Sequence, residues 1–342
     1  MHTHIPPRRA PAAHTAVAVL VAAAACWGVG TVVSKQVVDD VAPLTLLPLQ
    51  LAASCAFLLA VATVRREPLT WSPPVRRLAA LGVLNPGLAY ALGLIGLTTI
   101  TASMYVLLWA TEPVVILLLA ALVLREHIPS ALVGAVTVAV LGVLLVVFRP
   151  GAAGDAVGIT LTLVSVSFCA LYTVLTRRLL LDDSSLGVVL AQQAAALVFA
   201  IVLVTLVGVA GGTGWNLDGL GAATWAGAAV SGVLYYGLGF WFYVTGLRLV
   251  PASYAGAFLP LIPVFGVAAG YLVGERLAAQ QWLGAAAVVA ATVVIALRPG
   301  RGERRDSRLP DGSRTFGVPR RVHRPAGMLG RSRTSKRRHE CE

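Results

Sequence analysis

The stretch GVLNPGLAYALGLIGLTTITASMYVLLWATEPV, residues 82–114, recurs 150 residues later as GVLYYGLGFWFYVTGLRLVPASYAGAFLPLIPV, residues 232–264. Eleven of the 33 aligned positions are identical. Self-similarity at one spacing is the mark of an internal repeat. The sequence therefore indicates two copies of one unit.

Further matches extend the repeat on both sides of this stretch. At a shift of 149, Glu126 meets Glu275, and Arg-Pro-Gly at 149–151 meets Arg-Pro-Gly at 298–300. Near a shift of 143, Gln50 meets Gln193. The duplication thus covers most of the chain outside its C-terminal tail.

The composition excludes a water-soluble fold. Of the 342 residues, 57% are hydrophobic and 12% are charged, whereas soluble domains carry about 25% charged residues. Such a chain cannot cover a soluble surface with charge, and it is too hydrophobic for intrinsic disorder. We expect a polytopic membrane protein.

The apolar runs have the length that a bilayer requires. A hydrocarbon core of about 30 Å takes about 20 helical residues, and open strand edges cannot be satisfied in lipid. Ten runs qualify: 13–33, 41–64, 78–97, 101–123, 129–148, 156–176, 186–208, 222–247, 252–274 and 279–297. We predict an all-α integral membrane fold, with ten transmembrane helices forming two inverted five-helix repeats.

The inversion follows from the odd number of spans in each unit. A second copy of a five-span unit enters the membrane from the opposite face, as in many secondary transporters. Two antiparallel copies can exchange conformations, which provides inward-open and outward-open states of similar energy. The alternative is a duplication that only packs a membrane scaffold.

The charges of the loops predict the orientation. Cytoplasmic loops carry an excess of Lys and Arg. Eleven basic residues fall on the side of the termini: Arg8, Arg9, Arg65, Arg66, Arg76, Arg77, Arg125, Arg177, Arg178, Arg248 and Arg298. Three fall on the other side: Lys35, Arg149 and Arg276. Both termini are therefore expected in the cytoplasm.

These features divide the chain into four parts. We predict a cytoplasmic N-terminal segment (1–12), a first repeat (13–151), a second repeat (152–300) and a cytoplasmic tail (301–342). The tail holds 13 Lys/Arg and 5 Asp/Glu without apolar periodicity. It is expected to be disordered and to be attracted to anionic lipid.

Several segments resemble the drug/metabolite transporter superfamily, in particular its members with two EamA-like domains. The first half carries CWGVGTVVSK from Cys26, PLTLLPLQ ending at Gln50, and LREHIP with Glu126. The second half carries CALYTVLTRRL from Cys169 and VGERLAAQQWLGAA with Glu275. The resemblance implies ten helices around a central cavity near the midplane, with transport by alternating access.

Glu112 is the most informative polar residue, because it is the one acidic or basic residue well inside an apolar run. An ionised carboxylate at that depth costs at least about 2.5–3.5 kcal/mol on insertion scales. It could bind substrate or a proton, or it could be a protonated side chain bonded to a neighbouring helix. Its repeat counterpart is Ile262, so the halves differ chemically here.

Other candidates are amides, aromatic residues and a helix interruption. Gln50 and Gln193 either line the cavity or link helices, since each amide needs several hydrogen bonds. Asn85-Pro86-Gly87 either breaks a helix at a binding site or only kinks it. Together with the aromatic candidates, the predicted substrate-binding residues are Trp27, Gln50, Asn85, Tyr90, Glu112, Gln193 and Tyr236.

The function predicted from these features is secondary active transport of a small metabolite or amphipathic compound, by efflux or exchange. The alternatives are a non-transporting scaffold or receptor and, with less support, an intramembrane enzyme. We expect no catalytic residues, no metal site and no cofactor. The expected partners are the substrate and membrane lipid, without nucleic acid, in a monomer or homodimer of a bacterial plasma membrane.

Overall fold

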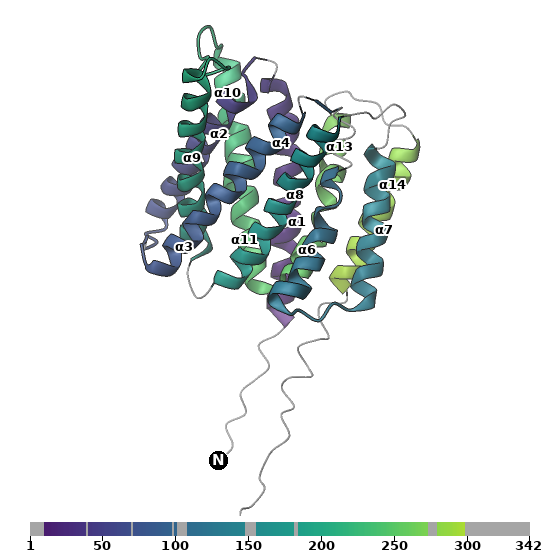
Figure 1. The fold of residues 1–342 in the computed structure, drawn as a ribbon. Coiled ribbons are helices and arrows are strands. Elements are labelled where there is room, and N and C mark those ends of the chain that lie inside the picture. Colours follow the sequence, from purple (N-terminus) through teal and green to yellow (C-terminus); the bar gives the residue numbers. More distant parts are fainter. Residues whose placement is uncertain are drawn as a thin grey trace, which may run out of the picture. The chain divides into compact units, whose positions relative to one another are not determined.

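The computed structural model describes residues 10–38, 40–69, 71–97, 99–100, 108–147, 155–180, 184–272 and 279–297. They belong to one compact unit, residues 1–300. All of the elements in these described ranges are helices (Figure 1), so the predicted all-α fold is confirmed. The predicted basic tail and the loop with Glu275 lie outside the described residues.

The elements of the two halves follow the same order. The first half contains α1 (Ala10–Val38), α2 (Pro43–Val64), α3 (Pro73–Gly82), η1 (Val83–Leu88), α4 (Ala89–Leu97), α6 (Glu112–Leu119), η2 (Ala120–Leu124) and α7 (Ser130–Val147). The second contains α8 (Ala156–Leu179), α9 (Ser185–Val209), α10 (Ala222–Ser231), η3 (Gly232–Gly239), α11 (Phe240–Leu249), α12 (Ala252–Gly256), α13 (Leu261–Leu272) and α14 (Ala279–Leu297). The π-helical segments η1 and η3 occupy matching positions.

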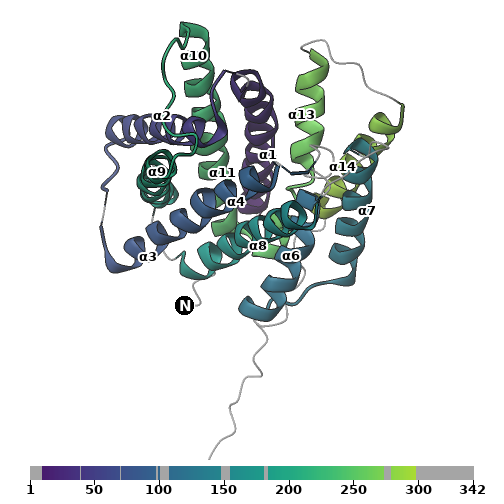
Figure 2. The same ribbon diagram turned by 45° about the horizontal axis from the view of Figure 1, so that its top comes forward.

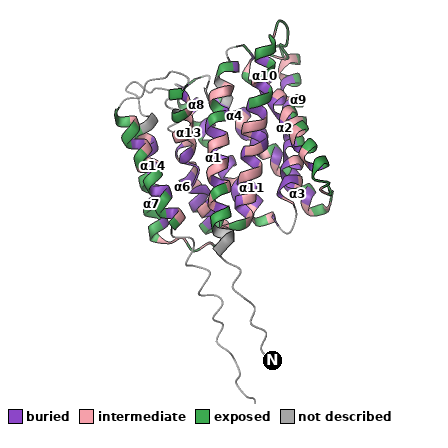
Figure 3. Cartoon of the chain, turned by 180° about the vertical axis from the view of Figure 1, so that it is seen from behind, coloured by how far each residue is buried: buried purple, intermediate pink, exposed green. Residues whose placement is uncertain are grey.

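Many of these helices can cross a membrane. Seven segments are long and apolar enough: His14–Ser34, Pro43–Val64, Ala156–Leu179, Ser185–Val209, Ala222–Leu249, Ala252–Leu272 and Ala279–Leu297. Glu112–Leu124 and Ser130–Leu145 are shorter apolar helices. Large apolar side chains such as Val64, Val209 and Leu272 are more than 80% exposed, and Figure 3 shows exposed residues on the outside of the bundle. Lipid accommodates such a surface, so the protein is a multi-pass membrane protein.

Short polar and proline-containing sequences start several helices. Ser72 precedes the prolines of α3, and its hydroxyl accepts a hydrogen bond from the amide of Val75. The Asp155 carboxylate accepts from the amide of Gly158 at 2.7 Å, which caps α8. Side-chain acceptors at helix starts satisfy amides that have no partner within the helix.

The helices of the two halves pack in exchanged pairs. In the interior, α1 packs against α11 and α13, whereas its counterpart α8 packs against α4 and α6. Likewise, α2 packs against α10 and η3, and α9 packs against α3 and η1. The outer pair is α7 with α14 (Figure 2). Each of these contacts thus has its repeat equivalent, as expected for two copies related by a two-fold exchange.

Two glycines allow the closest of these crossings. A Cβ on Gly82 would overlap the carbonyl of Gln192, and a Cβ on Gly232 would overlap the carbonyl of Gln50. Since Gly82 and Gly232 are repeat counterparts, the structural counterpart of Gln50 is Gln192. The sequence alignment that matched Gln50 with Gln193 was therefore wrong by one residue.

The described arginines near helix ends gather at one end of the bundle, where α1 begins and α14 ends (Figure 1). We call it the arginine-rich end. Its described members are Arg65, Arg66, Arg76, Arg77, Arg125, Arg177, Arg178 and Arg248.

Candidate functional site

The candidate site is built around matching interruptions in two helices. In the first half, a turn at Ala110–Thr111 precedes α6, which begins at Glu112. In the second half, a turn at 257–260 separates α12 from α13. The prolines that follow, Pro113 and Pro263, are repeat counterparts and lack the amide that a continuous helix needs. Glu112 therefore starts a helix, which corrects the expectation that it lies inside one.

The Glu112 side chain is half-buried. No hydrogen bond joins its carboxyl to any residue in the described part of the chain. Cys169 of α8 and Tyr243 of α11 lie within electrostatic range of it. The carboxyl thus lies near α8 and α11 of the second half.

Aromatic side chains from both halves form a cluster, and one of its members is Tyr243, which lies near Glu112. The aromatic cluster consists of Trp27, Tyr90, Trp109, Tyr172, Tyr235, Tyr236, Phe240 and Tyr243. The Trp27 ring lies 5.1 Å from Tyr243 and 5.5 Å from Phe240, measured between centroids. The hydroxyls of Tyr90 and Tyr235 are 2.5 Å apart. Three predicted site residues, Trp27, Tyr90 and Tyr236, are therefore brought together.

Gln193 joins this cluster from α9. Its amide nitrogen donates to the carbonyl of Tyr236 at 3.2 Å, while its buried Oε1 has no hydrogen-bond partner among the described residues. The Oδ1 of Asn85 and the Nε1 of Trp27 are buried in the same unsatisfied state. Buried polar atoms normally have partners, so these three atoms are available to a bound molecule or to water.

Asn85 is also where η1 departs from regular helix. Its backbone is extended, with φ −149° and ψ 122°, and its side chain is 6% exposed. The predicted interruption of this span is therefore confirmed. Its counterpart η3 contains Tyr235 and Tyr236.

Gln50 links helices through its side chain. Its amide nitrogen donates to Ser34 and Ser231, at 2.8 Å in each case. In the other half, the Gln192 nitrogen donates to Thr176 at 3.4 Å, and its Oε1 accepts from Tyr172. Of the two readings of Gln50, the structure shows the helix link.

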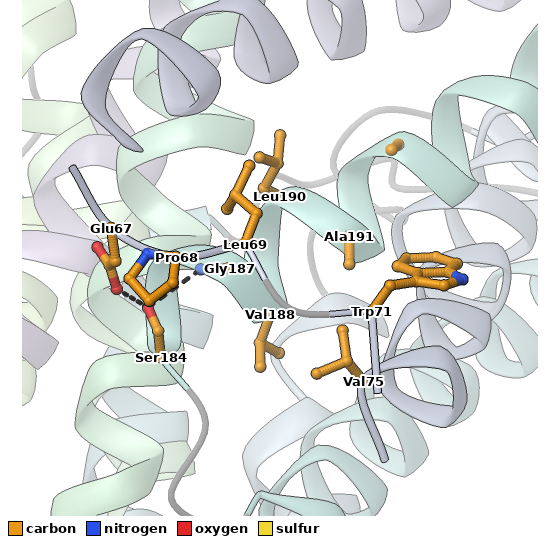
Figure 4. Close-up of a pocket in the computed structure, with 11 residues that line it drawn as sticks. Glu67, Pro68, Leu69, Trp71, Val75, Ser184, Gly187, Val188, Leu190 and Ala191 are labelled. Atoms are coloured by element: carbon orange, nitrogen blue, oxygen red, sulfur yellow. Dashed lines mark hydrogen bonds between the residues drawn. The ribbon is translucent and has the colours of Figure 1, made fainter. Parts of the chain in front are cut away.

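Two cavities occur at the arginine-rich end. The first, of about 660 Å³, lies between the α2–α3 connection and the start of α9. Figure 4 shows Glu67 and Ser184 joined by a hydrogen bond at one side of it and Trp71 at the other. The second, of about 350 Å³, is lined by Arg65, Arg248 and Trp241, among others, and shares Glu67 and Ser184 with the first.

Sequence reasoning missed these cavity-lining residues. The charges of the loops predict only which side of the membrane each loop faces. Glu67 and Ser184 lie in two connections that are 117 residues apart in the sequence, so no local pattern predicts that they meet. The Arg65 guanidinium lies 5.0 Å from the centre of the Trp241 ring, a cation–π contact between the halves. No periodicity within either helix predicts that pairing.

Comparison with known proteins decides the family. The model of the EamA-like transporter family matches the chain twice, over residues 14–148 and 156–297. The chain belongs to the EamA-like transporter family. The predicted resemblance is thereby confirmed, and the two EamA-like matches coincide with the two structural halves.

Similar proteins agree with this assignment. The chain is 26% identical over 270 residues to a protein of Archaeoglobus fulgidus described as an uncharacterized transporter, covering 79% of this chain and 94% of that protein. A crystal structure with 17% sequence identity superposes with a TM-score of 0.71, over 82% of this chain and 98% of that one. The latter shows a shared fold. As a member of the EamA-like family, the protein is a membrane transporter.

Proposed function

We propose that the protein is a secondary active transporter that moves a small metabolite or amphipathic compound, by efflux or exchange, through alternating access. Ten helical crossings, arranged as two inverted five-helix repeats, would form the carrier. The exchanged packing of the halves is the observation that carries this proposal. Two equivalent sets of contacts let either end of the bundle adopt the conformation of the other at similar energy.

The proposed substrate site is the aromatic cluster with Glu112, Asn85 and Gln193. The rings supply apolar surface, while the unsatisfied polar atoms of Trp27, Asn85 and Gln193 provide hydrogen bonds. Gln50 contributes by holding α2 against α1 and α10. A substrate with both apolar and polar parts fits this combination.

Glu112 is proposed to couple transport to protons. A carboxyl with no hydrogen-bond partner among the described residues can exchange a proton without breaking a structural contact. No described basic side chain pairs with the Glu112 carboxylate. Its charge would therefore be neutralised alternately by a bound substrate and by a proton. The pH gradient would then supply energy for the cycle.

The proposed location is a bacterial plasma membrane with both termini in the cytoplasm. The arginine-rich end would face the cytoplasm, and the basic tail would contact anionic lipid. The carrier would work as a monomer or homodimer, without a cofactor or nucleic acid.

Proteoliposome flux tests the proposal. We expect uptake of at least one compound from a broad metabolite panel, stimulated by an imposed pH gradient. Glu112→Gln should abolish the pH dependence and leave folding intact, because the amide keeps the size of the side chain and cannot ionise. Asp218→Asn, in an exposed loop at the opposite end, is the matched control and should leave transport unchanged.

Two results would contradict this assignment. Unchanged pH dependence in Glu112→Gln would remove Glu112 from coupling. Absence of flux for the whole panel would favour the second candidate, a non-transporting scaffold or receptor. The close packing of the aromatic cluster is the observation that favours this alternative.

A further inference from the structure

Glu126 joins the two halves at the arginine-rich end. It follows η2 and Arg125, whose backbone is left-handed with φ 55° and ψ 33°. Few residues other than glycine adopt this conformation. The turn ends the helix and directs the next residue, Glu126, towards α12 of the other half.

Three hydrogen bonds attach the Glu126 carboxylate to the first residues of α12. The amide of Ala252 donates to Oε1 at 2.9 Å. The amide of Ser253 donates to Oε2 at 3.1 Å, and the Ser253 hydroxyl donates to the same oxygen at 2.6 Å. Hydrogen bonds to an ionised acceptor are about twice as strong as neutral ones. One side chain of the first half therefore holds the start of a helix in the second half.

The segment that Glu126 holds, α12, is short and is followed by a turn of 3₁₀ type. α12 ends at Gly256, and the next amides bond three residues back: Phe258 to Ala255, Leu259 to Gly256, Leu261 to Phe258 and Ile262 to Leu259. These are the bonds of a 3₁₀ turn, which within a longer helix often marks a hinge. The helix α12 itself packs against α6, α8 and α11.

We propose that Glu126 is a latch that keeps α12 closed over the arginine-rich end, and that α12 swings about the turn at 257–260 when the latch opens. This role rests on the alternating-access function proposed above. The latch lies outside the aromatic cluster and outside the two cavities, so it controls access without binding substrate.

The opposite end supplies a contact of the same kind. There, the Thr224 hydroxyl at the start of α10 donates to the Asp40 carboxylate of the first half at 2.8 Å. Alternating access makes the two ends reciprocal, because opening one accompanies closure of the other. Loss of the Glu126 contact should therefore open one end and close the other, and loss of the Thr224 contact should do the reverse.

Thiol labelling at both ends measures this equilibrium. Leu247→Cys reports on the arginine-rich end, where the native side chain is fully buried next to α12, and Ala228→Cys reports on the opposite end, where the side chain is 3% exposed. The full-length protein is labelled in detergent, so that a maleimide reaches both ends. The background lacks the native thiols, namely Cys26, Cys55, Cys169 and Cys341.

A graded pair of variants tests the latch. Glu126→Gln should raise the labelling rate of the Leu247→Cys reporter about tenfold, because it replaces charge-assisted bonds by weaker ones. The rate of the Ala228→Cys reporter should fall. Ser253→Ala, which removes one of the three bonds, should shift both rates in the same directions by about threefold. Thr224→Val should produce the opposite pattern.

A purely structural contact gives a different result. If Glu126→Gln raises labelling at both ends, or changes neither while Ser253→Ala is also without effect, Glu126 is not a latch, even where flux persists. If the native protein carries no flux, the transport proposal fails separately, since labelling needs no substrate. A one-sided, reciprocal shift supports the latch.

Discussion

At the residue scale, the two halves repeat their polar links between helices. Gln50 bonds Ser34 of the preceding helix, and Gln192 bonds Thr176 of its own preceding helix. Both glutamines also lie under a glycine of the opposite half. In this repeated arrangement, the amides link α2 to α1 and α9 to α8.

Two substitutions in α2 compare the stability contribution of a hydrogen-bonded polar side chain with that of an unbonded one. Gln50→Leu removes hydrogen bonds to Ser34 and Ser231, which average about 0.6 kcal/mol each within membranes. We expect a loss of about 1 kcal/mol in the free energy of unfolding, measured by denaturant titration in detergent. Ser54→Ala should cost nothing, because the buried Ser54 hydroxyl has no partner among the described residues. A comparable loss in Ser54→Ala would show that this hydroxyl is bonded.

At the element scale, the helices cross where glycine removes the side chain. Gly82 and Gly232 lie against backbone of the opposite half, and Gly142 of α7 lies against Gly284 of α14. Without a Cβ, the backbones approach closely, as is common between membrane helices. Such crossings hold the two halves together.

A matched pair of glycine substitutions tests these crossings. Gly82→Ala should destabilise the protein by about 1–3 kcal/mol, because its Cβ meets the rigid backbone of Gln192 and forces the helices apart. Gly134→Ala should be neutral or stabilising by up to about 1 kcal/mol, because nothing lies within 4 Å of a Cβ there. The unfolding temperatures of the two variants, measured by thermal denaturation, test this difference in stability. Equal losses would mean that helix propensity, and not the crossing, controls the outcome.

At the scale of the whole molecule, the distribution of charge distinguishes the two ends of the bundle. The described arginines near helix ends gather at one end of the bundle, while exposed Asp218 lies in the loop at the other end. Both halves contribute arginines to that end, from Arg65 to Arg125 in the first half and from Arg177 to Arg248 in the second. The excess of arginine therefore depends on both copies.

Labelling of intact cells tests which side this end faces. Arg77→Cys, exposed at the arginine-rich end, should resist a membrane-impermeant maleimide until the cells are permeabilised. Asp218→Cys should react in intact cells. Reaction of Arg77→Cys from outside would reverse the proposed topology, and reaction of both residues from the same side would exclude it.

Much of the fold is readable from local sequence. Apolar runs of membrane length, with prolines and glycines between or within them, predict helices because lipid leaves the backbone no other way to satisfy its hydrogen bonds. The internal repeat predicts matching halves, and the prediction holds even for the interruptions at η1 and η3. Trp27, Tyr90 and Tyr236 share one aromatic cluster, and their role in substrate binding stays a prediction.

Pairings between distant residues come from the packed structure alone. The contact of Glu126 with Ala252 and the match of Gln50 with Gln192 both depend on how helices from different halves approach one another. Composition and periodicity indicate which face of a helix is apolar. They do not indicate its neighbour, because any of several apolar helices could pack against that face. Steric fit at a few glycines and a few buried hydrogen bonds selects one arrangement among them.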